Sequence, residues 1–158
     1  MPISIIIGGQ YGSERKGKIS DFRAREMNAS AVVRVGGPNS GHTVYASNGE
    51  KMAFIQLPTS CVRNDILSIL PAGSYINIQT LKKEIERANI SPDRLVIDFN
   101  AVIVDSECNK TESGLLMRET IGSTLSGTSQ AVSKPPGRGG FLSASIYRGY
   151  KNAYALFT

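Results

Sequence analysis

Tryptophan is absent from this chain, histidine occurs once, and cysteine occurs twice. Nucleic-acid binding usually needs a basic face with interleaved aromatic side chains, and no such face is visible here. No stretch approaches the roughly 18 apolar residues that span a bilayer, so nothing supports a membrane role. Cys61 and Cys108 lack metal-ligand spacing, and the N-terminus has no charged leader. We therefore expect reduced thiols and a cytoplasmic location.

The 158 residues are 41% hydrophobic and 20% charged, which is ordinary for one globular domain with a real core. The formal net charge of +5 suits anionic ligands. Most basic residues are scattered, and only Arg15, Lys16 and Lys18 form a local cluster. This distribution favours small phosphate-bearing ligands over nucleic acid.

Hydrophobic patterning predicts an α/β fold. The continuous β-branched run 3–7 is typical of a strand buried on both faces, hence of a parallel sheet. A first helix is expected over 16–27, an amphipathic helix over 79–88, and a hairpin of strands 43–45 and 52–55 around the Asn48-Gly49 turn. Further strands are expected over 31–35, 66–70, 95–99 and 101–104. Strands alternating with helices predict a mostly parallel, twisted sheet with flanking helices.

A glycine-rich turn, residues 8–18 (GGQYGSERKGK), joins the first expected strand to the first expected helix. Glycines let a backbone approach an anion closely, N–H groups at a helix start point outward, and Lys16 and Lys18 supply countercharge. Gly12, Gly17 and Lys18 have the spacing of a phosphate loop, but Ile19 stands where Ser or Thr would hold magnesium. The turn is a P-loop-like phosphate site without the ordinary metal ligand.

Two further loops contain small polar residues. The segment 39–43 (NSGHT) includes the only histidine, His42, whose ordinary pKa makes it the side chain best suited to donate a proton near neutral pH. The segment 123–129 (STLSGTS) offers hydroxyls and amides that suit a second phosphate, although a plain surface turn has the same composition. A structural role for a lone histidine also stays open.

In order and spacing, the segments 8–18, 36–43 (GGPNSGHT) and 121–127 (IGSTLSG) resemble the N-terminal part of adenylosuccinate synthetases. Residues 57–60 (LPTS) resemble the segment that follows the hairpin in that family. The resemblance runs from Ile3 to about Gly127, and the family's proteins are considerably longer. It implies a ligase that phosphorylates the 6-oxygen of a purine nucleoside monophosphate with ATP or GTP. The amine of L-aspartate then displaces the phosphate.

The resemblance also implies roles for particular residues. Catalytic roles fall to Ser13 at the position of the general base, to His42 as acid or electrophile, and to Lys16 for phosphate charge. Ser13 and Gly41 stand at the Mg²⁺ positions. Nucleotide contacts are implied for Gly12, Ser13, Glu14, Arg15, Lys16, Gly17, Lys18, Asn39, Ser40, Gly41, His42, Thr43, Ser123, Thr124 and, from a neighbouring subunit, Arg138. The chain is thus expected to form a homodimer if it is complete.

Departures from the family pattern are informative. Serine is not a base near neutral pH, and Ser13 in place of aspartate resembles the phage branch, which uses dGMP. A small hydroxyl leaves room for a 2-amino group, so a dGMP-like acceptor is favoured over IMP. Arg15 and Leu125 replace glycines of the family's motifs. Arg15 should be strained if its position needs positive φ, and the alternative is that it adds a phosphate contact. Pro135 and Pro136 interrupt an expected helix.

We therefore divide the chain into a nucleotide-binding part, 1–133, and a divergent tail, 134–158. The family's segments for donor-base selection and aspartate binding lie downstream of this chain. A nucleotide-binding fragment without turnover is accordingly the alternative to a ligase. A generic loop NTPase is a third class, and Ile19 argues against it.

Overall fold

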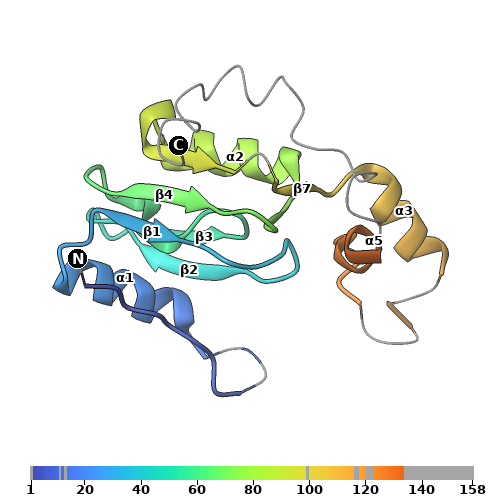
Figure 1. The fold of residues 1–158 in the computed structure, drawn as a ribbon, viewed down its shortest axis with the longest axis horizontal. Helices are drawn as coiled ribbons and strands as arrows, with labels where there is room; N and C mark the ends of the chain where they lie inside the picture. Colours follow the sequence, from blue (N-terminus) through green and yellow to red (C-terminus); the bar gives the residue numbers. More distant parts are fainter. Residues whose placement is uncertain are drawn as a thin grey trace.

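The structure, a computed structural model, describes residues 2–10, 12, 14–98, 100–115, 118–119 and 123–133. Its central sheet has the strand order β1-β4-β6, formed by β1 (Ala31–Val33), β4 (Leu67–Leu70) and β6 (Leu95–Ile97). All pairings are parallel, with Val33 opposite Ile69 and Ile69 opposite Val96. Helix α1 (Lys16–Glu26) lies below the strands in Figure 1, and α2 (Ile78–Ala88) lies above them. The expected parallel α/β architecture is confirmed.

The predicted hairpin is present as β2 (His42–Tyr45) and β3 (Lys51–Phe54). The strands are antiparallel, with His42 opposite Phe54, and Gly49 has the positive φ of 82° that the turn needs. A short 3-10 helix, η1 (Thr59–Val62), follows β3. The hairpin contributes buried side chains, among them Phe54 and Val44, to the same core as the parallel strands.

Helix α2 begins and ends at side chains suited to those positions. The Oδ1 of Asn77 accepts a hydrogen bond from the Thr80 amide at 3.0 Å, and Asn89 ends the helix with the left-handed φ of 49°. Its apolar face places the fully buried Leu81 in the main core, which explains why the amphipathic pattern was predictive. The 3-10 turn η2 (Pro92–Arg94) then leads directly into β6.

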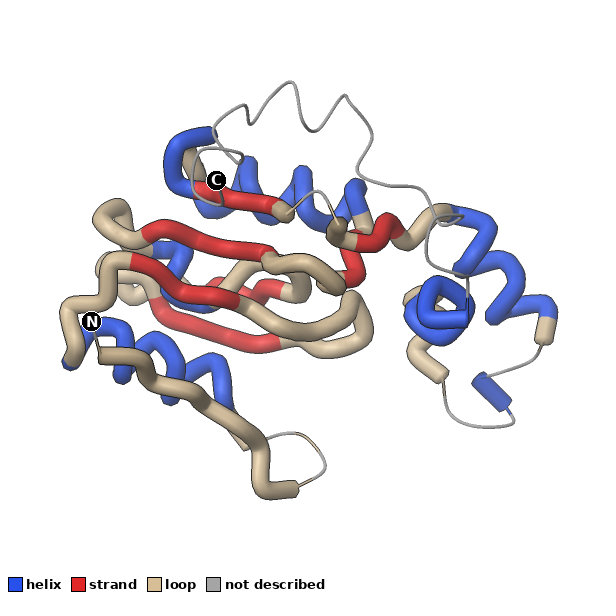
Figure 2. Tube along the Cα trace, in the orientation of Figure 1, coloured by secondary structure: helices blue, strands red, loops and turns tan. Residues whose placement is uncertain are grey.

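The last described elements form a separate helical pair. A small parallel sheet of β5 (Tyr75–Ile76) and β7 (Val102–Ile103) precedes α3 (Ser106–Gly114) and α5 (Thr128–Ser133). Both helices lie at one end of the molecule, beyond β7 (Figures 1 and 2). The pattern did not predict α3 or α5, because their sequences are rich in Ser, Thr and Gly and have little apolar periodicity.

The expected first strand, residues 3–7, is not formed. The segment is extended but unpaired, and it runs beside α1 away from the sheet (Figure 2). Ile3, Ile5 and Ile7 are 85%, 80% and 82% exposed. A β-branched run predicts strand propensity, but a strand also needs a hydrogen-bonding neighbour, and β1 has only β4 as partner among the described residues. The glycine-rich turn therefore follows a free extended segment.

The cysteines and the lengths of the helices bear on the expectations from composition. Cys61 and Cys108 are both buried, and no disulfide joins them. Within the part of the chain that the structure describes, no helix has the length and apolarity required to cross a bilayer. The divergent tail, 134–158, and its Arg138 lie outside the described residues.

Candidate functional site

The first and second loops meet at Gly17 and His42. A Cβ on Gly17 would lie 2.7 Å from the His42 Cβ and 2.9 Å from the Thr59 Cγ2, so this position has no room for a side chain. The Thr59 hydroxyl donates a hydrogen bond of 2.7 Å to the Gly17 carbonyl. The start of α1, the start of β2 and the start of η1 therefore form one contact.

The His42 ring is held by the chain that follows β3. Its Nε2 lies 2.5 Å from the Leu57 carbonyl oxygen, which can only accept, so Nε2 carries the proton. In the neutral ring Nδ1 is then an acceptor, and it becomes a donor only when the ring is protonated. Burial lowers the pKa of His42, the Leu57 carbonyl opposes this, and the charge of Arg34 lowers it further.

The second loop, residues 34–41, leaves the carboxyl end of β1, where ligands of parallel sheets commonly bind. The Arg34 guanidinium donates to the Ser40 carbonyl at 3.1 Å and to the Ser40 hydroxyl at 3.3 Å. Burial lowers the pKa of Arg34, and Glu84 opposes this shift. Arg34 stays charged and braces the loop from inside. Sequence reasoning missed this residue, because the pattern showed it only as one member of a strand.

The third loop contacts the second. A Cβ on Gly37 would lie 3.1 Å from the Asn39 Oδ1 and 3.1 Å from the Thr128 Cγ2. The hydroxyl of Thr124 contacts that of Ser126 at 2.9 Å, and Ser126 contacts Thr128 at 3.1 Å. These hydroxyls form a short chain that starts on the solvent-exposed Thr124.

Glu112, a fully buried residue of α3, holds the third loop. Its carboxylate accepts from the Gly127 amide at 2.8 Å, the Ser129 amide at 2.9 Å and the Ser129 hydroxyl at 2.6 Å. Burial alone would raise the pKa of Glu112, but the hydrogen bonds from Ser129, Gly127 and Gln130 outweigh it and lower the pKa. The amides at the start of α5 that were expected to face a phosphate are thus partly occupied by a carboxylate of the chain itself.

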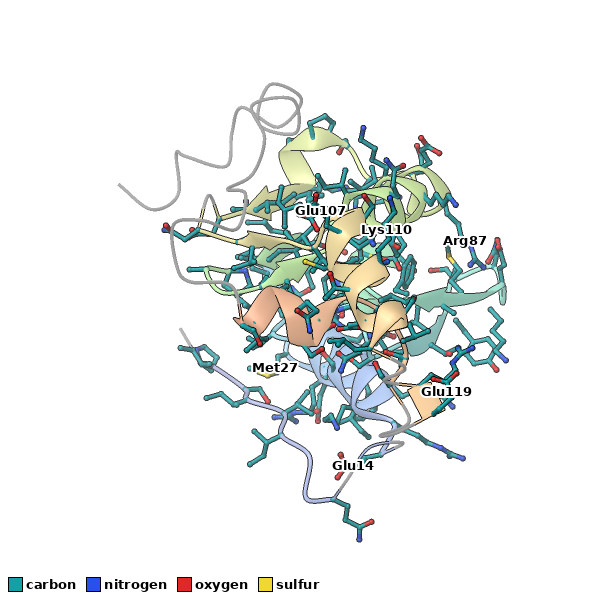
Figure 3. All side chains as sticks on the ribbon, turned by 90° about the vertical axis from the view of Figure 1, so that its right-hand side faces the viewer. Glu14, Met27, Arg87, Glu107, Lys110 and Glu119 are labelled. Carbon is teal, nitrogen blue, oxygen red and sulfur yellow. The ribbon has the colours of Figure 1, made fainter. Side chains whose placement is uncertain are left out.

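In the first loop the Glu14 side chain binds groups of the loop itself. Its carboxylate accepts from the Gln10 amide and pairs with the Lys16 ammonium, each at 2.5 Å. The hydrogen bond from Lys16, followed by that from Gln10, lowers the pKa of Glu14. Figure 3 shows Glu14 well away from Glu107 and Lys110 of α3. Ser13, the expected base position, lies outside the described residues.

Both replacements of family glycines adopt the left-handed backbone. Arg15, directly before α1, has φ 59°, and Leu125 in the third loop has φ 54°. Both positions therefore have the positive φ on which the expected strain depends, a conformation that residues with a Cβ rarely adopt. Gly12 has φ 91°, which glycine adopts at no such cost.

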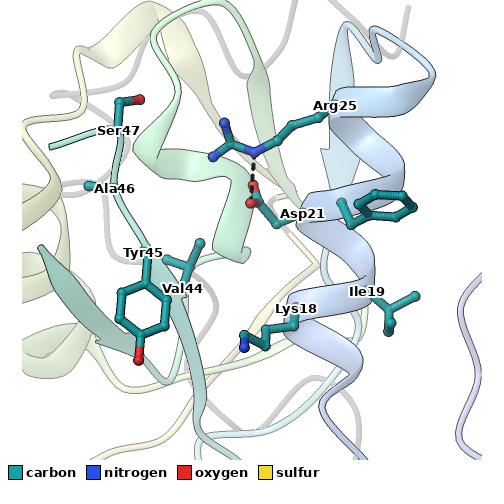
Figure 4. A pocket seen from close by; sticks show the side chains of 9 residues that line it. Lys18, Ile19, Asp21, Arg25, Val44, Tyr45, Ala46 and Ser47 are labelled. Carbon is teal, nitrogen blue, oxygen red and sulfur yellow. Dashed lines mark hydrogen bonds and ion pairs between the residues drawn. The ribbon is translucent and has the colours of Figure 1, made fainter. Parts of the chain in front are cut away.

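A cavity of about 520 Å³ opens between α1 and β2, and Lys18 is the one residue of the three loops that lines it. Figure 4 shows the Asp21 carboxylate paired with Arg25, whose Nε lies 2.9 Å away. The Lys18 ammonium stands 5.7 Å from the centre of the Tyr45 ring. The side chain of Lys18, which was expected to bind phosphate, therefore points from α1 toward Tyr45 of β2.

The gathered loops can present amides, hydroxyls and cationic side chains to an anionic ligand, with a single imidazole between them. The fold and these loops place the chain in a class of α/β proteins. In this class, loops of small residues lie beside the carboxyl end of a parallel strand and form the ligand site.

The model of the adenylosuccinate synthetase family matches residues 5–154. The chain belongs to this family. Adenylosuccinate synthetase of Methanococcus maripaludis is 35% identical over 136 residues, which are 83% of this chain and 40% of the relative. That of Xylella fastidiosa is 33% identical over 155 residues, 90% of this chain and 34% of the relative. The chain thus spans less than half the length of these curated relatives.

Solved structures agree with the fold. Fully ligated adenylosuccinate synthetase of Plasmodium falciparum superposes with a TM-score of 0.78 at 29% identity, over 94% of this chain and 36% of that one. The cyanophage S-2L succinoaminodeoxyadenylate synthetase PurZ, bound to dGMP and to dATP as an energy donor, gives 0.67 at 24% identity. That superposition covers 88% of this chain and 40% of PurZ and shows a shared fold.

Proposed function

We propose that this chain is the nucleotide-binding part of a purine-nucleotide ligase that joins L-aspartate to C6 of a purine nucleoside monophosphate. ATP or GTP is the phosphoryl donor. The observation that carries the proposal is the contact of Gly17, His42 and Thr59, which puts the lone imidazole beside the start of α1. Membership of the adenylosuccinate synthetase family supports the same chemistry.

In the proposed reaction the N1 proton of the purine is removed and O6 attacks the γ-phosphorus, so that the nucleoside diphosphate leaves. The amine of aspartate then attacks C6, and inorganic phosphate leaves with the former O6. Negative charge develops on O6 in the first step, and a protonated His42 can stabilise it through Nδ1–H. Bound phosphates favour this protonation, because nearby negative charge raises the pKa that burial lowers. Lys16 supplies positive charge to the phosphates once it leaves Glu14.

The acceptor in this proposal is dGMP-like rather than IMP. Ser13 carries the argument, because its small neutral hydroxyl leaves space for a 2-amino group and can hydrogen-bond to it. The fold likeness to PurZ, whose structure holds dGMP, is consistent with this choice. Since serine is not a base, the N1 proton has to pass to another acceptor, such as solvent or a phosphate oxygen.

The described residues fit Mg²⁺ only as part of a nucleotide complex. No three His, Cys, Asp or Glu side chains gather as a metal cluster among them, and the carboxylate of Glu14 is paired with Lys16. Mg²⁺ commonly keeps several waters and takes oxygens from substrate phosphates. The Gly41 carbonyl, together with Ser13, would add the protein's ligands, and the ion would balance phosphate charge.

Binding without turnover is the second candidate, because Ser13, at the expected position of the general base, is not a base near neutral pH. Calorimetric titration with dGMP, IMP, ATP and GTP tests the binding site, and phosphate release with and without aspartate tests the ligase. We expect dGMP to bind more tightly than IMP and release to depend on aspartate. Binding without aspartate-dependent release would leave only the second candidate, and no nucleotide binding would refute both.

A cytoplasmic homodimer completes the proposal. Arg138 would then reach the monophosphate of the neighbouring subunit, as the family resemblance implies. Sedimentation in the presence of dGMP tests this part, because a site shared between subunits should increase the dimer fraction when it is occupied.

A further inference from the structure

Glu84 of α2 is a buried carboxylate that the proposed chemistry does not use. Its relative exposure is 7%, and it accepts hydrogen bonds from consecutive amides: Ile55 at 2.5 Å, Gln56 at 2.9 Å and Leu57 at 2.9 Å. These amides belong to the chain between β3 and η1. A carboxylate in such a position accepts only, so it matches a row of N–H donors that no neutral side chain matches equally well.

The same stretch of chain carries both contacts that build the site. The Leu57 carbonyl accepts from His42 Nε2, and the Thr59 hydroxyl, two residues on, donates to the Gly17 carbonyl. The amide of Leu57 is bound to Glu84 while its carbonyl binds His42. The Glu84 carboxylate therefore holds the peptide segment whose carbonyl keeps the His42 proton on Nε2. The same segment leads to Thr59, which contacts the first loop at Gly17.

We propose that Glu84 is a positioning residue of the nucleotide site, which acts through Leu57 to hold His42 with Nε2 protonated and Nδ1 free for the ligand. The role in nucleotide binding rests on the proposed function. The effect of Glu84 on the His42 proton can be tested without any nucleotide. Glu84 itself touches no reacting atom. Its effect reaches the site through the backbone of 55–59.

Glu84→Gln tests the inference, because the amide replaces one acceptor oxygen by a donor NH₂ that faces backbone N–H groups. The readout is the ring Nε2 proton of His42, and this chain has no other histidine, so the NMR assignment is unambiguous. In the wild type we expect a hydrogen-bonded, slowly exchanging proton at a pH where the ring is neutral. In Glu84→Gln we expect exchange at least about tenfold faster, as for loss of a well-formed hydrogen bond.

Glu112→Gln is the matched control. It removes another buried carboxylate, which accepts comparable hydrogen bonds but from the third loop. A merely structural contribution of Glu84 predicts the same loosening of His42 in both variants, which would overturn the inference. Unchanged exchange in a folded Glu84→Gln would overturn it as well. If Glu84→Gln does not fold, Glu84→Asp keeps the charge and shortens the arm, and exchange as slow as in the wild type would then contradict the role.

Nucleotide titration separates this inference from the proposed function. If the wild type binds neither dGMP nor IMP, the proposed function fails whatever His42 shows in Glu84→Gln. If the wild type binds dGMP, Glu84→Gln should bind it at least about tenfold more weakly, while Glu84→Asp recovers part of the loss. Equal affinity in wild type and folded Glu84→Gln would refute the positioning role alone.

Discussion

At the scale of one residue, Arg15 stands where the loop has a left-handed backbone conformation that suits glycine better. It is exposed, it precedes α1, and its backbone has φ 59° and ψ 27° with no side-chain hydrogen bond to the helix end. A residue with a Cβ in this conformation costs roughly 1–2 kcal/mol, and glycine does not bear this cost. The Arg15 carbonyl accepts from the Lys18 and Ile19 amides, as glycine at this position also could, and its side chain makes no hydrogen bond or ion pair among the described residues.

We predict that Arg15→Gly increases the free energy of unfolding by about 1 kcal/mol. The measurement is urea denaturation followed by circular dichroism. Arg15→Ala is the matched control, since alanine removes the charge and keeps the backbone strain, and it should leave stability nearly unchanged. A gain in Arg15→Ala equal to that in Arg15→Gly would show that charge, and not backbone conformation, is responsible.

Gly17 is the residue at which the absence of a side chain matters most for the site. Gly17→Ala places a Cβ 2.7 Å from the His42 Cβ, so α1 and β2 have to separate. We expect a loss of roughly 1–3 kcal/mol in stability, as for overpacking of a core, and weaker nucleotide binding. Gly9→Ala is the control, because a Cβ there meets nothing within 4 Å. Equal effects of the two variants on calorimetric titrations would contradict the close contact.

At the scale of elements, two helices each use one buried glutamate to hold a loop. Glu84 of α2 binds the chain after β3, and Glu112 of α3 binds the start of α5. Glu84 lies 27 to 29 residues from the amides that donate to it, and Glu112 lies 15 and 17 residues from those that donate to it. Short-range patterns do not encode such pairings, and in the amphipathic α2 a glutamate is expected on the solvent face. This is why sequence reasoning found the loops but missed the residues that position them.

Glu112 of α3 should make the free energy of unfolding decrease in acid. Because the pKa of Glu112 is lower in the folded protein than its ordinary value, its contribution is complete above the ordinary pKa and is lost as pH falls through the folded pKa. Glu112→Gln removes this contribution. We expect it to be less stable at pH 7 by about 2 kcal/mol and to lose less stability than the wild type between pH 7 and pH 3.5 in urea titrations. Parallel curves for the two proteins would contradict this.

At the scale of the whole molecule, the predicted alternation of strands and helices is confirmed, and the predicted first strand is wrong. The chain leaves large apolar side chains exposed, among them Ile3, Ile5 and Ile7 in the free segment, Val33 at the edge of β1, and Phe22 on α1. Both the edge strand β1, with its unpaired backbone groups, and the separate segment with exposed isoleucines favour association between chains.

Ile5→Lys should therefore lower self-association without loss of stability. Ile5 is 80% exposed, so its replacement removes no packing in the single chain. Sedimentation velocity at increasing concentration should show a smaller associated fraction than the wild type, with the same urea midpoint. A fall in the midpoint would mean that the segment is paired and buried in solution, as the β-branched run predicts.

The residues that make the proposed chemistry possible can be read from the chain alone, because they are local in sequence: glycines that bring backbone close to an anion, a lone imidazole, and a short basic cluster. Helix and hairpin positions follow from periodicity and turn residues for the same reason. Tertiary structure alone decided which loops touch, which nitrogen of His42 holds the proton, and which carboxylates brace the loops. These outcomes depend on partners far apart along the chain, whose pairing energy exists only once the sheet and helices have brought them together.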